Sequence, residues 1–339
     1  MSASDAYWQR KMSGQLLELD GRQFKPRAQA LMNLQEMFAV PPQNWTVRNM
    51  RGAYRKSVAL FDGPKPAVRE VRDITLELKG RNLKGRVYDN RPIEDYKPAL
   101  LFFHGGGFVI GDLETHDGVC RRIARYTGAK VISVAYRLAP EHPFPSGLDD
   151  ALDSWVWLQE QAENLKVDPT QLYVAGDSAG AVLSLLVTAT ASKGKIGVQP
   201  AATGLIYPAD LMVQTSPTRD MLANENIVLT KEILDWFQNQ FATDELNENH
   251  EYVRALSEAQ KGNIGPVWIM TCGFDPLRHE GEGLITKLQA LGAEVQHKEY
   301  QDLYHGFIGA AALFPEVDEM AEDFAAFLAP LKEKAKKAS

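Results

Sequence analysis

A serine flanked by two glycines is the strongest chemical signal in the sequence. Residues 176–180 read GDSAG, an apolar run at 172–175 precedes them, and residues 179–189 are apolar almost all round. These runs predict a buried strand and a buried helix joined by a sharp turn that raises Ser178 above the sheet edge in a strained conformation. Such a serine can act as a nucleophile. A glycine-rich turn whose serine caps a helix is the alternative interpretation.

A base must take the proton of a serine hydroxyl before it attacks, and the base is usually a histidine oriented by a carboxylate. In hydrolases with this kind of turn, the acid and then the histidine follow the serine along the chain. The histidines after Ser178 are His250, His279, His297 and His305. His305 lies in a loop directly after the strand expected at 295–300, where the catalytic loops of open sheets gather. We therefore predict His305 as the base.

The orienting acid should also follow a strand. Asp275 comes just after the strand expected at 267–271, so we predict that it orients the histidine. Asp302 is nearer to His305 in the sequence but is interpreted as a solvated loop residue. Glu280 and Glu282 are assigned to the next helix.

A second glycine-rich segment follows the buried strand expected at 99–103. Residues 104–108 read HGGGF, and three glycines allow the backbone amides to turn towards a ligand, as the oxyanion of an acyl-transfer reaction requires. A dinucleotide-binding loop would need a glycine where Ile110 stands, so that function is excluded. His104 is expected to brace this loop rather than to transfer protons.

Composition limits the possible partners and the cellular setting. The chain has 339 residues, is 45% hydrophobic and carries a formal net charge of −7, which argues against a nucleic-acid partner. Its two cysteines, Cys120 and Cys272, are far apart, and the polar first 21 residues lack a signal-peptide core. We therefore expect a cytoplasmic protein, with no membrane partner and no metal site.

The elements that position these motifs alternate along the chain. A hairpin with its turn at 79–82 opens a sheet, and strands then alternate with helices, as in a doubly wound α/β fold. Helices are expected before the sheet, from Pro26 and around 47–61, and the alternation breaks again after Pro208. We predict an N-terminal helical cap segment at 1–65, a catalytic core at 66–207 and 263–339, and an inserted cap segment at 208–262. Aromatic residues of the insertion could line an acyl pocket or simply bury the underside of the cap: Trp236, Phe237 and Phe241.

Together, five motifs resemble the hormone-sensitive-lipase-like carboxylesterases of the α/β-hydrolase fold. They are HGGGFVIG at 104–111, YRLAPEHPFP at 136–145, GDSAG at 176–180, DPL at 275–277 and YHGF at 304–307. The resemblance implies a mostly parallel eight-stranded sheet flanked by helices, with a helical cap. It implies Ser178 as nucleophile, His305 as base and Asp275 as orienting acid.

The same resemblance assigns the oxyanion hole to the amides of Gly106, Gly107 and Ala179, and it implies that Gly105 and Asp177 support the loop and the turn. The chain departs from the family at His279, where an acidic residue is common, which makes His279 a second candidate base.

The expected activity is hydrolysis of small, short-chain acyl esters through an acyl-enzyme, without a metal or organic cofactor. Amide or carbamate hydrolysis by the same triad is the first alternative, and a non-catalytic ligand-binding protein of the same fold is the second. The resemblance also suggests a homodimer, by analogy alone.

Overall fold

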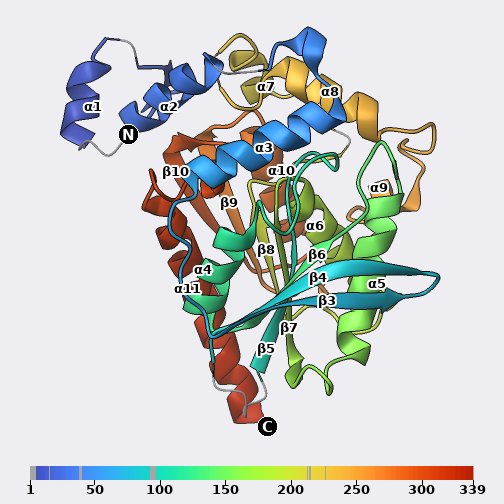
Figure 1. Cartoon of the computed structure of the whole chain (residues 1–339). Coiled ribbons are helices and arrows are strands. Elements are labelled where there is room, and N and C mark those ends of the chain that lie inside the picture. The colour runs from blue at the N-terminus through green and yellow to red at the C-terminus, as the bar shows by residue number, and fades with distance from the viewer. Residues whose placement is uncertain are drawn as a thin grey trace.

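An eight-stranded sheet forms the centre of the computed structural model, which describes residues 5–14, 16–37, 40–91, 97–211, 213, 215–225 and 227–338. Its strand order is β10-β9-β8-β7-β5-β6-β4-β3 (Figure 1). The strands are β3 (Glu70–Leu78), β4 (Arg81–Asp89), β5 (Lys97–Phe103), β6 (Lys130–Ala135), β7 (Val167–Asp177), β8 (Ala202–Ile206), β9 (Val267–Phe274) and β10 (Val295–Tyr304). Of these, β4 alone runs against the others, because it pairs antiparallel with both β3 and β6. The predicted mostly parallel sheet is confirmed.

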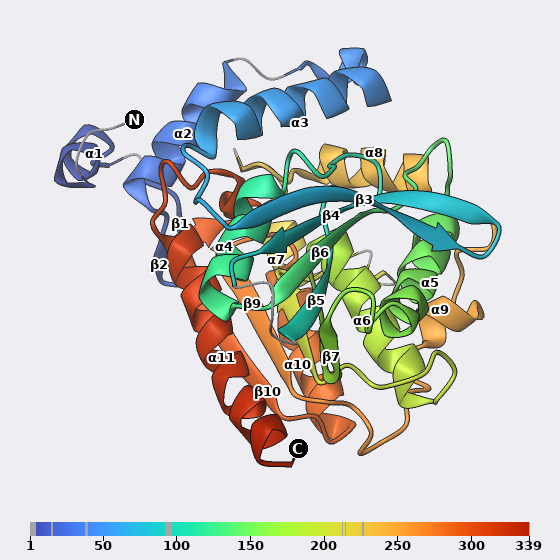
Figure 2. The same cartoon turned by 60° about the horizontal axis from the view of Figure 1, so that its bottom comes forward.

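Helices cover both faces of this sheet (Figure 2). Along β5, Leu101 and Phe103 pack into the apolar cluster shared with α5, α6 and α10, whereas Leu100 and Phe102 pack into the cluster shared with α4 and α11. Such alternation is what a strand buried on both faces requires. The helices are α1 (Asp5–Lys11), α2 (Pro26–Glu36), α3 (Val47–Phe61), α4 (Asp117–Thr127), α5 (Ser146–Glu160), α6 (Ala179–Ser192), α7 (Pro217–Met221), α8 (Lys231–Phe241), α9 (Glu251–Arg254), α10 (Arg278–Ala290) and α11 (Glu316–Ala338).

Several boundaries differ from those expected from the sequence. The hairpin turn is two residues long, since Leu78 pairs with Arg81, so the expected turn at 79–82 was too wide. Strand β10 continues to Tyr304, which pairs with Phe274 after an irregularity, so β9 and β10 both extend to the residues before the predicted acid and base. Short elements went unpredicted because they span too few residues for a periodic pattern: β1 (Glu18–Leu19), β2 (Arg22–Gln23), α1, α7 and α9.

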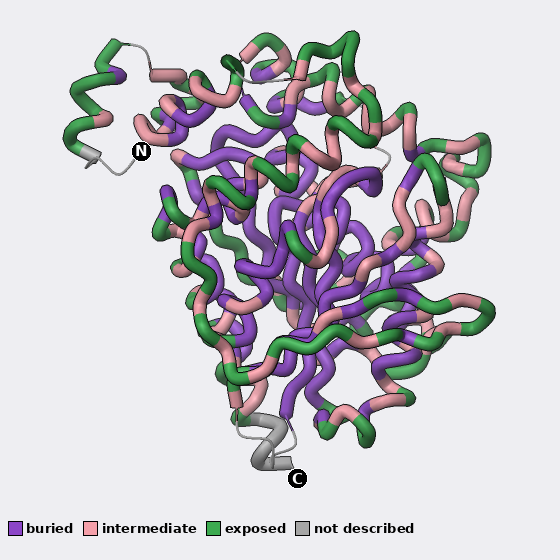
Figure 3. Tube along the Cα trace, in the orientation of Figure 1, coloured by how far each residue is buried: buried purple, intermediate pink, exposed green. Residues whose placement is uncertain are grey.

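Four helices, α2, α3, α7 and α8, lie over the end of the sheet where the parallel strands finish (Figure 1). We call them the covering helices. Helix α3 is tied down by Arg51, whose guanidinium donates to the carbonyls of Val109 (2.8 Å) and Ala139 (3.0 Å). The covering helices are mostly half-buried or exposed, in contrast to the buried strands beneath them (Figure 3).

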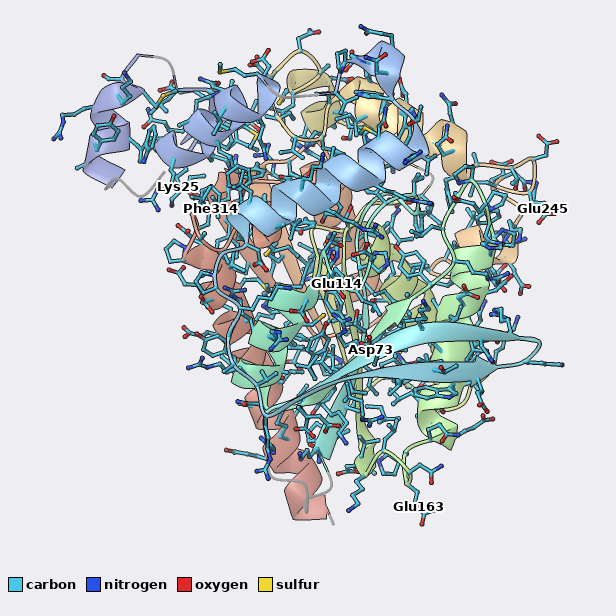
Figure 4. All side chains as sticks on the ribbon, in the orientation of Figure 1. Lys25, Asp73, Glu114, Glu163, Glu245 and Phe314 are labelled. Atoms are coloured by element: carbon cyan, nitrogen blue, oxygen red, sulfur yellow. The ribbon has the colours of Figure 1, made fainter. Side chains whose placement is uncertain are left out.

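A second attachment lies at the start of α2. Lys25, labelled in Figure 4 near Phe314, forms ion pairs with Asp302 at 2.9 Å and with Glu316. Although burial opposes the charge, these two carboxylates raise the pKa of Lys25 above its ordinary value. The N-terminal segment is therefore fixed to the end of β10, just before His305, and to the start of α11.

Candidate active site

Ser178 occupies the turn between β7 and α6. Its φ of 53° and ψ of −118° form a conformation that non-glycine residues rarely adopt. The turn is held by close packing: a Cβ atom at Gly180 would lie 1.9 Å from the Phe103 carbonyl oxygen. The Ser178 amide donates to the carbonyl of Ile206, at 2.8 Å. The backbone around the serine is thus fixed by both neighbouring strands.

His305 follows β10 directly and reaches both of its predicted partners. Its Nε2 lies 2.8 Å from Ser178 Oγ, and its Nδ1 lies 2.8 Å from Asp275 Oδ2. Asp275 is fully buried after β9, and its Oδ1 accepts a hydrogen bond from the amide of Leu277 at 2.8 Å. When Nδ1 donates to the carboxylate, Nε2 is left to accept the serine proton, which is the geometry of a general base.

The other candidates from the sequence have different partners. Their contacts are His279 Nδ1 with Thr218 Oγ1 (3.2 Å), His297 Nε2 with Thr271 Oγ1 (2.8 Å), Asp302 with Lys25 (2.9 Å) and Glu280 with Arg219 (2.6 Å). His250 accepts from the amide of Tyr252 at the start of α9. The structure therefore brings His305 and Asp275, rather than these residues, to the serine.

The glycine loop after β5 has backbone angles that glycine adopts more readily than other residues. Gly106 and Gly107 have φ values of 116° and 59°, and a Cβ at Gly106 would lie 2.2 Å from the Ile110 carbonyl oxygen. Ala179 opens α6, where the first amides have no partner within the helix. Within the described part of the chain, the amides of Gly106, Gly107 and Ala179 donate to no backbone carbonyl. Gly107 and Ala179 line the same cavity as Ser178, and free N–H groups in a glycine loop and at a helix start can bind an anion.

The serine turn and the glycine loop are joined by Asp177, which the resemblance assigned as a support. Its Oδ1 accepts from the amide of Gly105 at 2.8 Å and lies 3.2 Å from His116 Nε2. Although burial opposes both charges, His116 lowers the pKa of Asp177, and Asp177 raises the pKa of His116. A buried His116–Asp177 contact, which is an ion pair whenever His116 is protonated, therefore lies next to Ser178.

Sequence reasoning missed His116. It gave this residue no role, and the structure places it directly before α4, as the N-cap residue. One available signal was chemical: a buried aspartate next to the nucleophile needs a cationic or donor partner.

His104 has the contacts expected of a residue that braces the loop. Its ring stacks on Tyr136, with centroids 4.4 Å apart, and the Tyr136 hydroxyl donates to the His104 carbonyl at 2.7 Å. Burial lowers the pKa of His104 to about 4, so the ring stays neutral at neutral pH.

A cavity of about 110 Å³ opens at Ser178 beneath α8. Its walls combine the glycine loop and the start of α6 with apolar residues of the insertion: Gly107, Phe108, Ala179, Leu229, Leu234, Phe237 and Phe241. Trp236 instead packs against Trp45, with centroids 6.3 Å apart. Phe237 and Phe241 thus line the cavity and Trp236 packs on the N-terminal segment, while an acyl pocket at this place stays a prediction. We call this space the catalytic cavity.

The described residues contain neither a metal-binding cluster nor a membrane-spanning helix. In that part of the chain, no three His, Cys, Asp or Glu side chains are grouped so that they could hold a metal ion. Across the same residues, none of the helices combines the length and apolar character needed to cross a bilayer.

Known proteins resemble this chain over most of its length. A family model described as alpha/beta hydrolase fold matches residues 100–309. The carboxylic ester hydrolase LipN of Mycobacterium tuberculosis is 33% identical over 305 residues, which cover 87% of this chain and 80% of LipN. The ethyl acetate hydrolase of Pseudomonas putida is 32% identical over 274 residues, covering 79% of this chain and 85% of that protein.

Solved structures agree with the sequence relatives. The hyperthermophilic esterase of the archaeon Pyrobaculum calidifontis superposes with a TM-score of 0.82 at 31% identity, over 92% of this chain and 99% of its own. Ester hydrolase EH1AB1 from the Lake Arreo metagenome superposes with a TM-score of 0.83 at 30% identity. The match covers 90% of this chain and 98% of EH1AB1. Since sequence and fold agree over this length, the chain belongs to the α/β-hydrolase fold family and is a carboxylesterase of its hormone-sensitive-lipase-like branch.

Proposed function

We propose that this carboxylesterase works through Ser178, His305 and Asp275 and forms an acyl-enzyme. The observation that carries the proposal is the pair of 2.8 Å contacts on His305, one to each partner. His305 Nε2 accepts the serine proton while Oγ bonds to the ester carbonyl carbon. Asp275 holds Nδ1 and stabilises the imidazolium that forms.

The amides of Gly106, Gly107 and Ala179 then bind the oxyanion of the tetrahedral intermediate. Their N–H groups are already in place, so little reorganisation is needed when charge develops on the oxygen. As the intermediate collapses, His305 donates its proton to the leaving alcohol and Ser178 remains acylated. Water then attacks the acyl carbon, His305 takes a proton from it, and the acid leaves as Ser178 Oγ regains its proton.

Segments 1–65 and 208–262 act in this proposal as a cap that selects small, short-chain acyl esters. A catalytic cavity of about 110 Å³ supports this preference, because sites for drug-sized ligands measure roughly 300–1,000 Å³. The name of the Pseudomonas putida relative, ethyl acetate hydrolase, also supports a preference for small esters.

The test is hydrolysis of p-nitrophenyl esters from acetate to decanoate by the wild type and by Ser178→Ala. We expect short chains to be preferred and kcat to fall about 10⁴-fold or more in the variant. A second pair separates the two candidate bases: His305→Ala should abolish turnover, while His279→Ala should keep most of it. Equal rates for Ser178→Ala and wild type would overturn the mechanism, and loss of activity only in His279→Ala would reassign the base.

A further inference from the structure

A second, larger cavity lies beside the catalytic cavity and has no part in the proposed mechanism. Its volume is about 440 Å³, compared with about 110 Å³ at Ser178. Its lining residues come from α5, α6, α9 and α10 and from the segments next to them. We call it the side cavity.

The side cavity is lined mainly by aliphatic side chains. Its apolar lining includes Val182, Leu185, Leu186, Leu256, Leu284 and Leu291. Two polar groups in its wall already have partners, since the Tyr252 hydroxyl donates to Asp149 at 2.6 Å and Lys287 pairs with Asp210 at 2.7 Å. Such a surface favours a hydrocarbon chain over a charged or strongly polar group.

One short segment separates the two spaces. Ala209, Asp210 and Leu211 line both the catalytic cavity and the side cavity, so they form the wall between them. We call these three residues the partition. Leu211 has the bulkiest apolar side chain of the three and packs with Ala209 against the apolar cluster of α5 and α6.

The partition is held in place from α10. The amide of Asp210 donates to Glu280 Oε2 at 2.9 Å, and the side chain of Asp210 pairs with Lys287 at 2.7 Å. Glu280 is itself buried and bonded to Arg219 at 2.6 Å. Because both the backbone and the side chain of Asp210 are fixed, the wall is a defined element of the structure.

We propose that the partition sets the chain-length limit of the esterase, and that Leu211 keeps a longer hydrocarbon chain of the substrate out of the side cavity. This inference rests on the proposed function and deepens it. Without the Leu211 side chain, the two cavities join, and a chain that starts at Ser178 can continue between α6 and α10. Each methylene that then leaves water gains roughly 3- to 4-fold in binding.

The experiment measures kcat/KM for p-nitrophenyl butyrate and decanoate with Leu211→Ala. The decanoate-to-butyrate ratio should rise about 10-fold or more over the wild type. A parallel series of acetate esters with longer alcohols identifies which side of the ester enters the side cavity, since only the series whose chain enters should gain. A folded Leu211→Ala with an unchanged ratio in both series overturns the proposal.

Two further variants show which cavity the hydrocarbon chain of the substrate enters. Leu229→Ala enlarges the catalytic cavity alone, and Leu256→Trp fills the side cavity alone. Leu256→Trp should cancel the gain of Leu211→Ala but leave any gain of Leu229→Ala intact. If Leu256→Trp leaves the gain of Leu211→Ala intact, the hydrocarbon chain of the substrate does not enter the side cavity and the proposal fails.

Two controls keep the result interpretable. If Leu211→Ala does not fold, Lys287→Ala replaces it: this lysine is exposed and its removal deletes the ion pair with Asp210, so the ratio should rise a few-fold. An unchanged ratio there would count against the partition. Failure of the proposed mechanism would look different, because Ser178→Ala would then still hydrolyse butyrate.

Discussion

The residues beneath the catalytic cavity and those above it are positioned in different ways. Ser178, Asp275, His305 and the glycine loop at 104–108 all follow strands directly, at the ends of β7, β9, β10 and β5. We call them the catalytic floor. The covering helices instead reach the cavity with side chains such as Phe237, from a helix that is largely half-buried or exposed. The floor is therefore fixed by backbone pairing, whereas the cover depends on side-chain packing that can be changed locally.

This difference predicts two kinds of mutational effect. Changes in the floor should lower the rate with every ester or unfold the protein, because the sheet, loop and turn share backbone contacts. Changes in the cover should alter which ester is preferred while the chemistry persists, because side chains there shape the cavity without holding the reacting groups.

The largest effect is expected for Gly180→Ala. The new methyl group would lie 1.9 Å from the Phe103 carbonyl oxygen and 2.8 Å from that of His104. Both are backbone atoms, so β5 and α6 would have to move apart, and we expect the free energy of unfolding to fall by about 4 kcal/mol or more. Urea denaturation followed by circular dichroism measures the loss.

Gly283→Ala is the matched control. Gly283 also lies in a helix, α10, but a Cβ there would meet nothing within 4 Å. The substitution should stabilise the protein by about 0.5–1 kcal/mol, through helix propensity alone. If Gly180→Ala folds as well as this control, the floor is less rigid than its close contacts indicate.

A smaller loss of stability is expected for residues that support the floor from outside, such as His116. His116→Gln keeps a hydrogen-bond donor for Asp177 but removes the positive charge. Because the pKa of His116 is raised in the fold, its stabilisation is fully present below the ordinary value of 6.5 and is lost as the pH rises through the raised pKa. Asp177, whose pKa is lowered, stays charged across this range. We expect the variant to lose about 2 kcal/mol of stability at pH 6.

Urea titrations at pH 6 and pH 9 test this brace. The stability gap between wild type and His116→Gln should narrow markedly at the higher pH. A gap of equal size at both pH values would show that the ion pair contributes no charge-dependent stability.

The sequence predicts the floor well and the cover poorly, for physical reasons. Apolar runs bounded by glycines place strands, and open sheets gather chemistry at their carboxyl ends, so Ser178, Asp275 and His305 could be selected before the structure was known. The irregularity in β10 before Tyr304 pairs with Phe274 had no local signal in the sequence. The predicted strands at 267–271 and 295–300 were therefore too short.

Contacts between segments far apart in the sequence were harder still to predict. His116 meets Asp177 only because β5 and β7 are neighbours in the sheet, which sequence order does not reveal. The partition at 209–211 likewise depends on Glu280, 70 positions away from Asp210. In the cover, a helical stripe of aromatics predicts burial but not whether the ring faces a cavity or another helix, as Trp236 and Phe237 show.

The smallest effect is expected in the cover itself, for Phe237→Ala. The Phe237 ring lies against Gly107, so close that a Cβ on that glycine would be 2.4 Å from the ring. Removing the ring widens the catalytic cavity next to the glycine loop and leaves the contacts among the floor residues themselves in place. We expect kcat for p-nitrophenyl acetate to change less than about 3-fold, while the preference moves by roughly 10-fold towards branched acyl groups. Asn239→Ala, on the exposed side of α8, is the control and should change neither quantity. If Phe237→Ala instead slows all esters by about 100-fold, then this ring holds the glycine loop in place, and α8 belongs functionally with the floor.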